Sequence, residues 1–293
     1  MFRGVKFMET WEILIIASTS IFVLLLPCFV FRILIKPNKY REGMENFKSV
    51  RYAHRGLHND KVPENSMGAF KLAVDAGYGI ELDVRLSSDG ELMVFHDDTL
   101  DRMTSECGRV DARTADELKK IKLKGSEETL PTLREVLKLV DGKVPLLIEM
   151  KEEAGKYGVT EKTVEVLKEY QGPFIVESFN PLALGRLKML APDVMRGFLS
   201  QKFMKDKNHR KIQFWFLQNM LFNYTAKPDF IAYRHSDYDV CALKFIKKHY
   251  KKIPLIAWTV ESVEDDKAAI DNGFSGIIFQ NYHPNTTVSG EKR

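Results

Sequence analysis

The sequence predicts an α/β protein: a closed parallel (β/α)8 barrel with a small insertion after the second strand, preceded by one transmembrane helix. Three observations lead to this prediction. Short apolar runs alternate with amphipathic segments between residues 50 and 280, residues 98–130 interrupt the alternation, and an uncharged apolar run lies near the amino terminus. Strands alternating with helices are typical of parallel sheets. An open doubly wound sheet is the alternative, but it favours a glycine-rich phosphate turn after the first strand, which His54-Arg55-Gly56 is not.

The order of elements follows from these runs. Strands are expected at residues 50–53, 79–86 with an extension at 92–95, 145–150, 174–177, 195–199, 230–233, 254–259 and 276–279. Helices are expected near residues 66–76, 132–140, 159–170, 181–190, 209–222, 240–250 and 262–272. The polar stretch 98–130 is expected to form an inserted subdomain or lid. The unusually apolar segment 213–222 is interpreted as a core helix, with a membrane-dipping face that collects lysophospholipid as the alternative.

Composition limits the class of protein. With 293 residues and 44% apolar residues the chain is long enough for one barrel domain, for which ~250 residues is typical. The net charge of +4 is small and the basic residues are scattered, so no nucleic-acid partner is expected. Cys28, Cys107 and Cys241 fit neither a disulfide framework nor a metal motif, and their low number favours a reducing compartment.

The amino-terminal run of residues 13–31 has no charge and, at ~1.5 Å per residue, gives a helix of about 28 Å, close to the thickness of a bilayer core. A cleaved signal peptide is the alternative, but no small-x-small site follows the run. Basic residues are more frequent after the run than before it. We therefore expect a single-pass anchor and juxtamembrane segment at residues 1–40 and a barrel domain at residues 48–285 on the cytoplasmic side.

Strand 79–86 places two acids together. Alternate side chains of a strand share a face, so Glu81 and Asp83 lie on one face and the apolar residues between them on the other. Neighbouring carboxylates on a buried strand require a cation, and hard oxygen ligands favour calcium or magnesium. The alternative is the polar side of an exposed strand.

Other polar residues follow the predicted strands. The carboxyl ends of parallel barrel strands meet on one face, so these residues are expected to converge. They are His54, Arg55, His96, Glu149, Lys151 and, on a later strand, Trp258. Cations for phosphate oxygens, acids for a divalent ion and histidines for proton transfer together predict phosphoryl transfer.

With these residues in this order, the chain resembles the glycerophosphodiester phosphodiesterase family. The resemblance covers residues 50–280 and rests on His54-Arg55-Gly56, Pro63-Glu64-Asn65-Ser66, Glu81-Leu82-Asp83-Val84, Asp89-Gly90, Val94-Phe95-His96-Asp97, Pro131-Thr132-Leu133, Ile148-Glu149-Met150-Lys151 and Ala257-Trp258-Thr259-Val260. It implies a TIM-type barrel with a Ca²⁺ or Mg²⁺ ion that hydrolyses glycerophosphodiesters to glycerol 3-phosphate and an alcohol in phospholipid catabolism.

The same resemblance implies roles for single residues. The general acid/base pair is His54 and His96; the metal ligands are Glu81, Asp83 and Glu149; the phosphate contacts are Arg55 and Lys151; Trp258 lines the pocket near the glycerol; and Glu64 and Asn65 shape the first loop. Glu64 has a plainer interpretation as a residue that favours the start of the next helix.

The last strand departs from the family's usual pattern, because it continues as Phe279-Gln280-Asn281-Tyr282-His283-Pro284. The identity of the alcohol that the enzyme releases is therefore left open. The expected partners are a small glycerophosphodiester or lysolipid substrate and the membrane. Two alternatives remain: a lysophospholipase D or phosphatidylinositol-phospholipase-C-like activity on intact lipids, and a non-catalytic sensor domain. The metal and the attacking nucleophile, water or a glycerol hydroxyl, also remain open.

Overall fold

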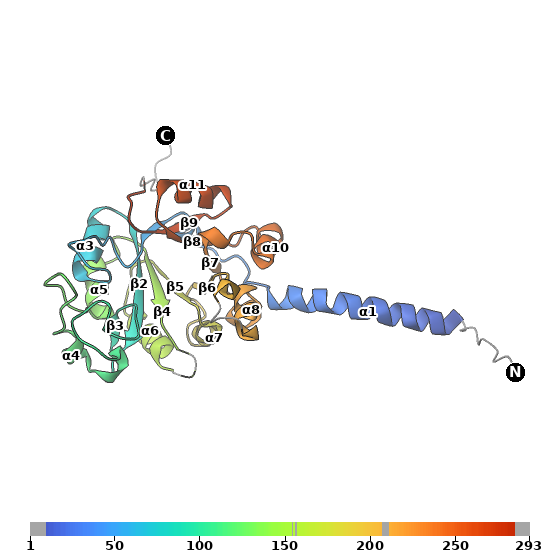
Figure 1. The fold of residues 1–293 in the computed structure, drawn as a ribbon, viewed down its shortest axis with the longest axis horizontal. Coiled ribbons are helices and arrows are strands. Elements are labelled where there is room, and N and C mark those ends of the chain that lie inside the picture. Colours follow the sequence, from blue (N-terminus) through green and yellow to red (C-terminus); the bar gives the residue numbers. More distant parts are fainter. Residues whose placement is uncertain (1–9, 154, 156, 207–210, 285–293) are drawn as a thin grey trace.

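Eight parallel strands close into a barrel in a computed structural model that describes residues 10–153, 155, 157–206 and 211–284 (Figure 1). The strands are β1 (Arg51–Ala53), β2 (Gly79–Leu86), β4 (Leu146–Met150), β5 (Phe174–Ser178), β6 (Arg196–Ser200), β7 (Phe230–Arg234), β8 (Leu255–Val260) and β9 (Gly276–Phe279). Because β1 pairs with both β9 and β2, no edge is left open between them. The predicted (β/α)8 barrel is confirmed, and the open sheet is wrong.

Helices cover the outside of the barrel. They are α3 (Met67–Asp75), α5 (Leu133–Val140), α6 (Val159–Leu167), α7 (Pro181–Leu190), α10 (Cys241–His249) and α11 (Val263–Asp271). Several begin at residues whose side chains accept a hydrogen bond from the first turn, as Ser66, Thr132, Asn180 and Ser262 do. Such N-caps satisfy backbone N–H groups that have no partner within the helix.

The alternation of side chains along the strands separates two apolar layers. Ile80, Leu82 and Val84 point outward and are fully buried beneath the helices. Leu147 and Ile175 belong to a second cluster that fills the barrel interior below the polar residues. Glu81 therefore lies above an apolar layer inside the barrel, and the apolar residues between Glu81 and Asp83 face the helices. The predicted division of faces on β2 is confirmed.

The insertion after β2 has an apolar core of its own. Strand β3 (Leu92–Val94) runs antiparallel to β2 and leads into η1 (Val110–Ala112) and α4 (Ala115–Leu118). Leu100, Leu118 and Leu130 are fully buried together with β3 residues. Residues 98–130 thus form a small packed subdomain beside the strand ends, as expected.

The interpretation of the apolar segment 213–222 as a core helix is wrong for its first half. The chain forms α8 (Ile212–Gln218) and then α9 (Asn223–Ala226), with a break at Met220, whose φ is 54°. Ile212 is 69% exposed and Trp215 is 42% exposed. Helix α8 contacts η2 (Phe203–Lys205), the short helix that follows β6, and its first turn is largely exposed. Residues 209 and 210 of the predicted helix lie outside the described residues.

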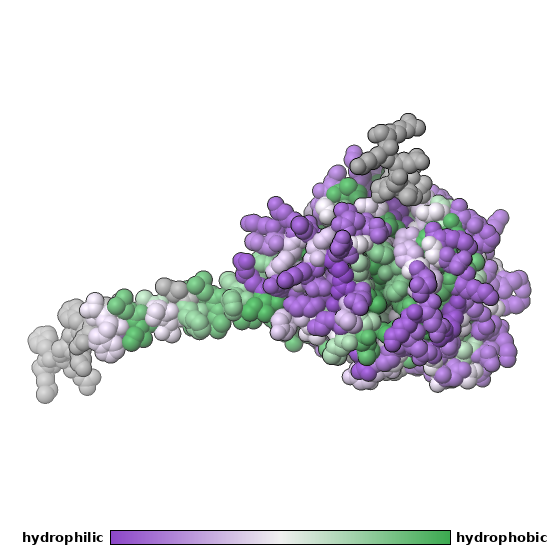
Figure 2. Space-filling view, turned by 180° about the vertical axis from the view of Figure 1, so that it is seen from behind, coloured by the Kyte–Doolittle hydropathy of each residue, from purple (hydrophilic) through white to green (hydrophobic). Residues whose placement is uncertain are grey.

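Helix α1 (Thr10–Leu34) projects from the barrel as an apolar rod, whereas the barrel surface is mostly hydrophilic (Figure 2). In length and composition it is able to span a bilayer, although signal sequences pass the same test.

The segment after α1 packs onto the barrel. Ile35 is fully buried, Met44 and Phe47 belong to the inner cluster, and Arg41 forms an ion pair of 3.3 Å with buried Asp229. Since these contacts continue up to β1, residues 35–47 are not a loose linker.

Candidate active site

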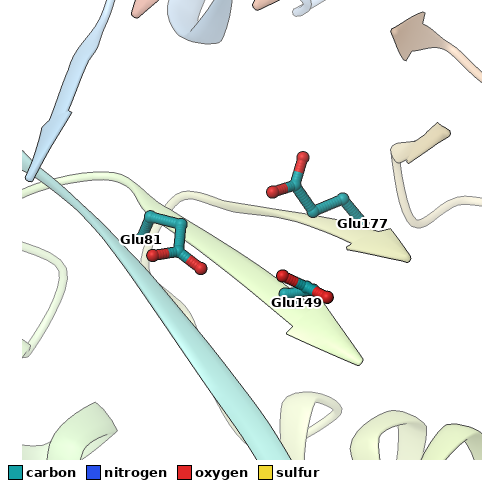
Figure 3. Close-up of side chains that lie close together, drawn as sticks. All are labelled: Glu81, Glu149 and Glu177. Atoms are coloured by element: carbon teal, nitrogen blue, oxygen red, sulfur yellow. The ribbon is translucent and has the colours of Figure 1, made fainter. Parts of the chain in front are cut away.

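Three buried glutamates face one another inside the barrel. Glu81 on β2, Glu149 on β4 and Glu177 on β5 are exposed by 2%, 6% and 1%, and one oxygen of each lies within 4.8 Å of the others (Figure 3). Burial raises the pKa of all three carboxyl groups, and repulsion from neighbouring carboxylates, Asp83 among them, raises it further. Among the described residues, Glu177 Oε2 has no hydrogen-bond partner. Glu149 is paired with Lys151, and a cluster of buried hard oxygen donors of which one oxygen has no partner fits a calcium or magnesium ion.

Glu177 was not among the sequence-predicted ligands. A signal was present, because residues 174–177 were predicted as a strand on which Glu177 alternates with Val176, just as Glu81 alternates with Leu82. The register pairs Glu149 with Glu177 and Asp83 with Glu149 across neighbouring strands. The third predicted ligand, Asp83, therefore lies in the same row of the barrel.

Asp83 already has positive partners. Lys151 Nζ lies 3.0 Å from its Oδ1 and 2.7 Å from Glu149 Oε1, and Arg55 Nε lies 3.5 Å from Asp83 Oδ2. Asn65 donates a hydrogen bond of 2.8 Å to the same Oδ2. Although burial acts in the opposite direction, Lys151, His96 and Arg55 lower the pKa of Asp83. The structure thus holds an ionised aspartate beside the glutamates; its role as a metal ligand stays a prediction.

Both predicted histidines are oriented through Nδ1. His54 directly follows β1, and its Nδ1 lies 2.6 Å from Gln280 Oε1. His96 Nδ1 lies 2.6 Å from Asp97 Oδ1. An acceptor at Nδ1 fixes the proton there and leaves Nε2 unprotonated. His54 Nε2 lies 4.0 Å from Glu81 Oε2. Burial lowers the pKa of His54 to about 3 and also lowers that of His96, so both rings are neutral near pH 7.

The first loop binds the insertion to the site. Arg55 adopts a φ of 57°, so that its backbone N–H donates to Glu81 Oε2 at 2.9 Å while its guanidinium contacts Glu64 at 2.7 Å. Arg102, in the insertion, contacts both Glu64 and Asp97. Asp97 in turn accepts a hydrogen bond from His96, so the insertion is joined to the site by a chain of ion pairs and a hydrogen bond that the sequence did not reveal.

Trp258 lies at the carboxyl end of β8. Its ring meets Phe179 edge to face at 5.4 Å, and the Arg234 guanidinium lies 5.2 Å from its ring centroid. The indole N–H is buried and has no acceptor among the described residues. Its place in a pocket near the glycerol stays a prediction.

Comparison with known proteins identifies the family. Residues 54–283 match the model of the glycerophosphoryl diester phosphodiesterase family. The chain belongs to this family. It is 35% identical over 242 residues to a glycerophosphodiester phosphodiesterase of Caldanaerobacter subterraneus, covering 79% of this chain and 93% of that one. The family membership confirms the expected phosphoric diester hydrolase and disfavours a mere sensor domain.

Solved structures agree with this assignment. An Oleispira antarctica phosphodiesterase in complex with the product sn-glycerol-3-phosphate is similar with a TM-score of 0.67 and 27% identity, covering 81% of this chain and 95% of that one. A glycerophosphodiester phosphodiesterase from Thermotoga maritima is similar with a TM-score of 0.62 and 25% identity, covering 78% and 93%. Both likenesses span the barrel.

Proposed function

We propose that the protein hydrolyses glycerophosphodiesters to glycerol 3-phosphate and an alcohol with the help of a divalent ion, in phospholipid catabolism. The observation that carries the proposal is the group of buried carboxylates, Glu81, Glu149 and Glu177, at the barrel mouth of a chain of this family. A bound Ca²⁺ or Mg²⁺ supplies positive charge to the phosphoryl oxygens. Asp83, next to this group, is proposed as a further ligand.

The chain's own residues act on the phosphodiester. Arg55 and Lys151 lie beside the carboxylates and present N–H groups suited to phosphate oxygens. His54 and His96 each have Nε2 free to accept a proton, so one removes a proton from the nucleophile and the other, once protonated, gives one to the leaving alcohol. The Trp258 N–H is available to a hydroxyl of the glycerol.

The structural neighbour with bound sn-glycerol-3-phosphate supports glycerol 3-phosphate as the product. Activity on intact lipids, the alternative, is not favoured by the names of the relatives.

We also propose that α1 is a single-pass membrane anchor with the barrel on the cytoplasmic side, because basic residues follow the helix. The domain proposed at residues 48–285, with its insertion at 98–130, is extended by the packed segment 35–47.

The experiment uses the full chain in lipid nanodiscs and a panel of glycerophosphodiesters, with glycerol 3-phosphate as the measured product. Turnover is expected with calcium or magnesium and lost after chelation. Glu149→Gln should lower turnover strongly, whereas Glu127→Gln, a side chain that is 88% exposed in the insertion, is the matched control. Full turnover after exhaustive chelation would exclude the metal, and no product with any diester would refute the activity.

A further inference from the structure

Helix α1 reaches the barrel without a linker. Its uncharged apolar run ends at Phe31, whose ring packs edge to face on Phe245 of α10 with 5.5 Å between the centroids. Arg32, the next residue, lies over the same ring, and Ile35 is fully buried in the barrel. Asn223, at the start of α9, donates a hydrogen bond of 2.8 Å to Ile35 O. The apolar run therefore ends at the barrel surface, and a bilayer crossed by α1 lies against α9 and α10 (Figure 1).

The barrel surface around the base of α1 is basic, and hydrophilic side chains gather there (Figure 2). The stretches that meet at this place, residues 30–41, 181–192, 211–228 and 240–260, contain no aspartate and no glutamate. Six lysines from them form what we call the basic face: Lys36, Lys188, Lys227, Lys244, Lys247 and Lys248. Because the whole chain has a net charge of only +4, this concentration of charge arises from the fold and not from the composition.

Three lysines of the basic face lie close enough to repel one another. Lys188 Nζ donates a hydrogen bond of 3.1 Å to Thr225 O, and Lys227 Nζ lies 4.8 Å from the centroid of the Tyr224 ring. Neither of these partners carries a negative charge. Burial lowers the pKa of Lys227, and the charges of Lys36 and Lys188 lower it further. An anion bound among these ammonium groups would offset their repulsion.

The basic face is not the face that carries the proposed catalytic residues. Helices α7, α9 and α10 end where the chain enters β6, β7 and β8, so their last turns lie toward the amino ends of the strands. Glu149 and Glu177 lie toward the carboxyl ends of β4 and β5. A barrel held by its basic face therefore leaves its mouth open to a water-soluble diester.

We propose that the basic face binds anionic phospholipid headgroups of the membrane that α1 crosses, and so holds the barrel in one orientation on that membrane. The inference rests on the proposed membrane anchor and not on the proposed reaction. Phosphate oxygens accept charge-assisted hydrogen bonds from ammonium groups, and an anionic surface attracts lysines within a Debye length, about 8 Å at physiological ionic strength. Lys244 and Lys248 lie within one turn of Phe245, which contacts the end of the apolar run, so α10 brings them into this range.

The test measures how fast a water-soluble reagent acetylates single lysines, mapped by mass spectrometry. The full chain is reconstituted in nanodiscs of phosphatidylcholine with or without phosphatidylglycerol, which is anionic. Phosphatidylglycerol should slow the acetylation of Lys188 and Lys227 several-fold, and high salt should reverse the effect because it screens the attraction. Lys120 is exposed just after α4, on the opposite side of the barrel from α1, and should react equally in both kinds of disc (Figure 1).

Two variants that lose the same charge test whether the basic face itself is responsible. The test variant replaces three exposed lysines of the face and keeps Lys188 and Lys227 as reporters: Lys36→Gln, Lys244→Gln and Lys248→Gln. Its equilibrium constant for headgroup binding should fall by on the order of 10²-fold, since each lysine near an anionic surface contributes roughly five-fold, and the protection should disappear. The control variant replaces three exposed lysines of the first loop, the insertion and α5, and should keep the protection: Lys61→Gln, Lys120→Gln and Lys138→Gln.

Several outcomes would overturn the inference. Equal acetylation of Lys188 and Lys227 in both kinds of disc would do so, as would loss of their protection in the control variant. Protection that is already present in detergent and is lost on dilution would assign the face to a second copy of the chain. If the full chain does not remain with the discs, the proposed anchor and the inference fail together. Release of glycerol 3-phosphate by the same samples reports separately on the proposed reaction, which none of these outcomes alters.

Discussion

The segment between α1 and the first strand should carry a large share of the barrel's stability. A fragment that starts at residue 34 keeps this segment, and one that starts at residue 44 loses residues 35–43 of it. The longer fragment retains Ile35, which is fully buried, and both Asn38 and Arg41, which bind the 1% exposed Asp229 at 2.7 Å and 3.3 Å. The domain bounds expected from sequence, an anchor and juxtamembrane segment at residues 1–40 and a barrel at 48–285, place Ile35 and Asn38 outside the barrel domain with which they make these contacts.

The cost of losing the segment follows from its contacts. Withdrawing Ile35 from the core removes about 1.5–3 kcal/mol of apolar burial. Leaving the Asp229 carboxylate without Arg41 costs roughly 3–5 kcal/mol, since a buried ion pair loses one partner. The Asn223 side chain also loses Ile35 O, for about 1 kcal/mol. The sum, roughly 5–9 kcal/mol, is comparable to the whole stability of a domain, about 5–15 kcal/mol.

Urea unfolding followed by far-UV circular dichroism measures this difference. The fragment from residue 34 should unfold cooperatively, and the fragment from residue 44 should be unfolded or marginal without denaturant. Within the longer fragment, Arg41→Met should lower the free energy of unfolding by roughly 3 kcal/mol. Lys39→Met, at an exposed position of the same segment, is the matched control. Equal stability of the two fragments, within ~1 kcal/mol, would refute the reasoning.

Three further predictions concern the site and the anchor. His54→Ala and His96→Ala should each lower kcat by ~10²-fold or more while His249→Ala does not, measured as release of glycerol 3-phosphate; near-wild-type turnover in either would contradict its role. Glu177→Gln and Asp83→Asn should each raise the metal concentration needed for half-maximal turnover, because a neutral amide holds a hard cation less well; an unchanged metal titration would remove that residue from the ligand set. Protease added to intact cells should spare the barrel and protease added after lysis should cut it, as an immunoblot shows; digestion in intact cells would reverse the proposed orientation.

The sequence alone determined the strands, most helices and the faces of the strands, because these depend on local spacing. A period of two residues places Glu81 and Asp83 on one face of β2 wherever that strand lies, and this face does point into the barrel. The run at residues 13–31 likewise shows a possible membrane span by composition. The order of strand-end residues was enough to reveal the family.

Only the tertiary structure decided which groups meet. Glu177 lies level with Glu149 and Asp83 because the register across β2, β4 and β5 pairs Asp83 with Glu149 and Glu149 with Glu177. Glu81, two residues before Asp83 on the same face of β2, reaches both glutamates. Spacing along the chain does not specify that register. Gln280 reaches His54 across 226 residues only because β1 and β9 close the barrel. The exposure of α8 could likewise not be predicted from the sequence. Apolar composition states what a segment is able to bury, and the packing around it decides whether a surface is there to bury it.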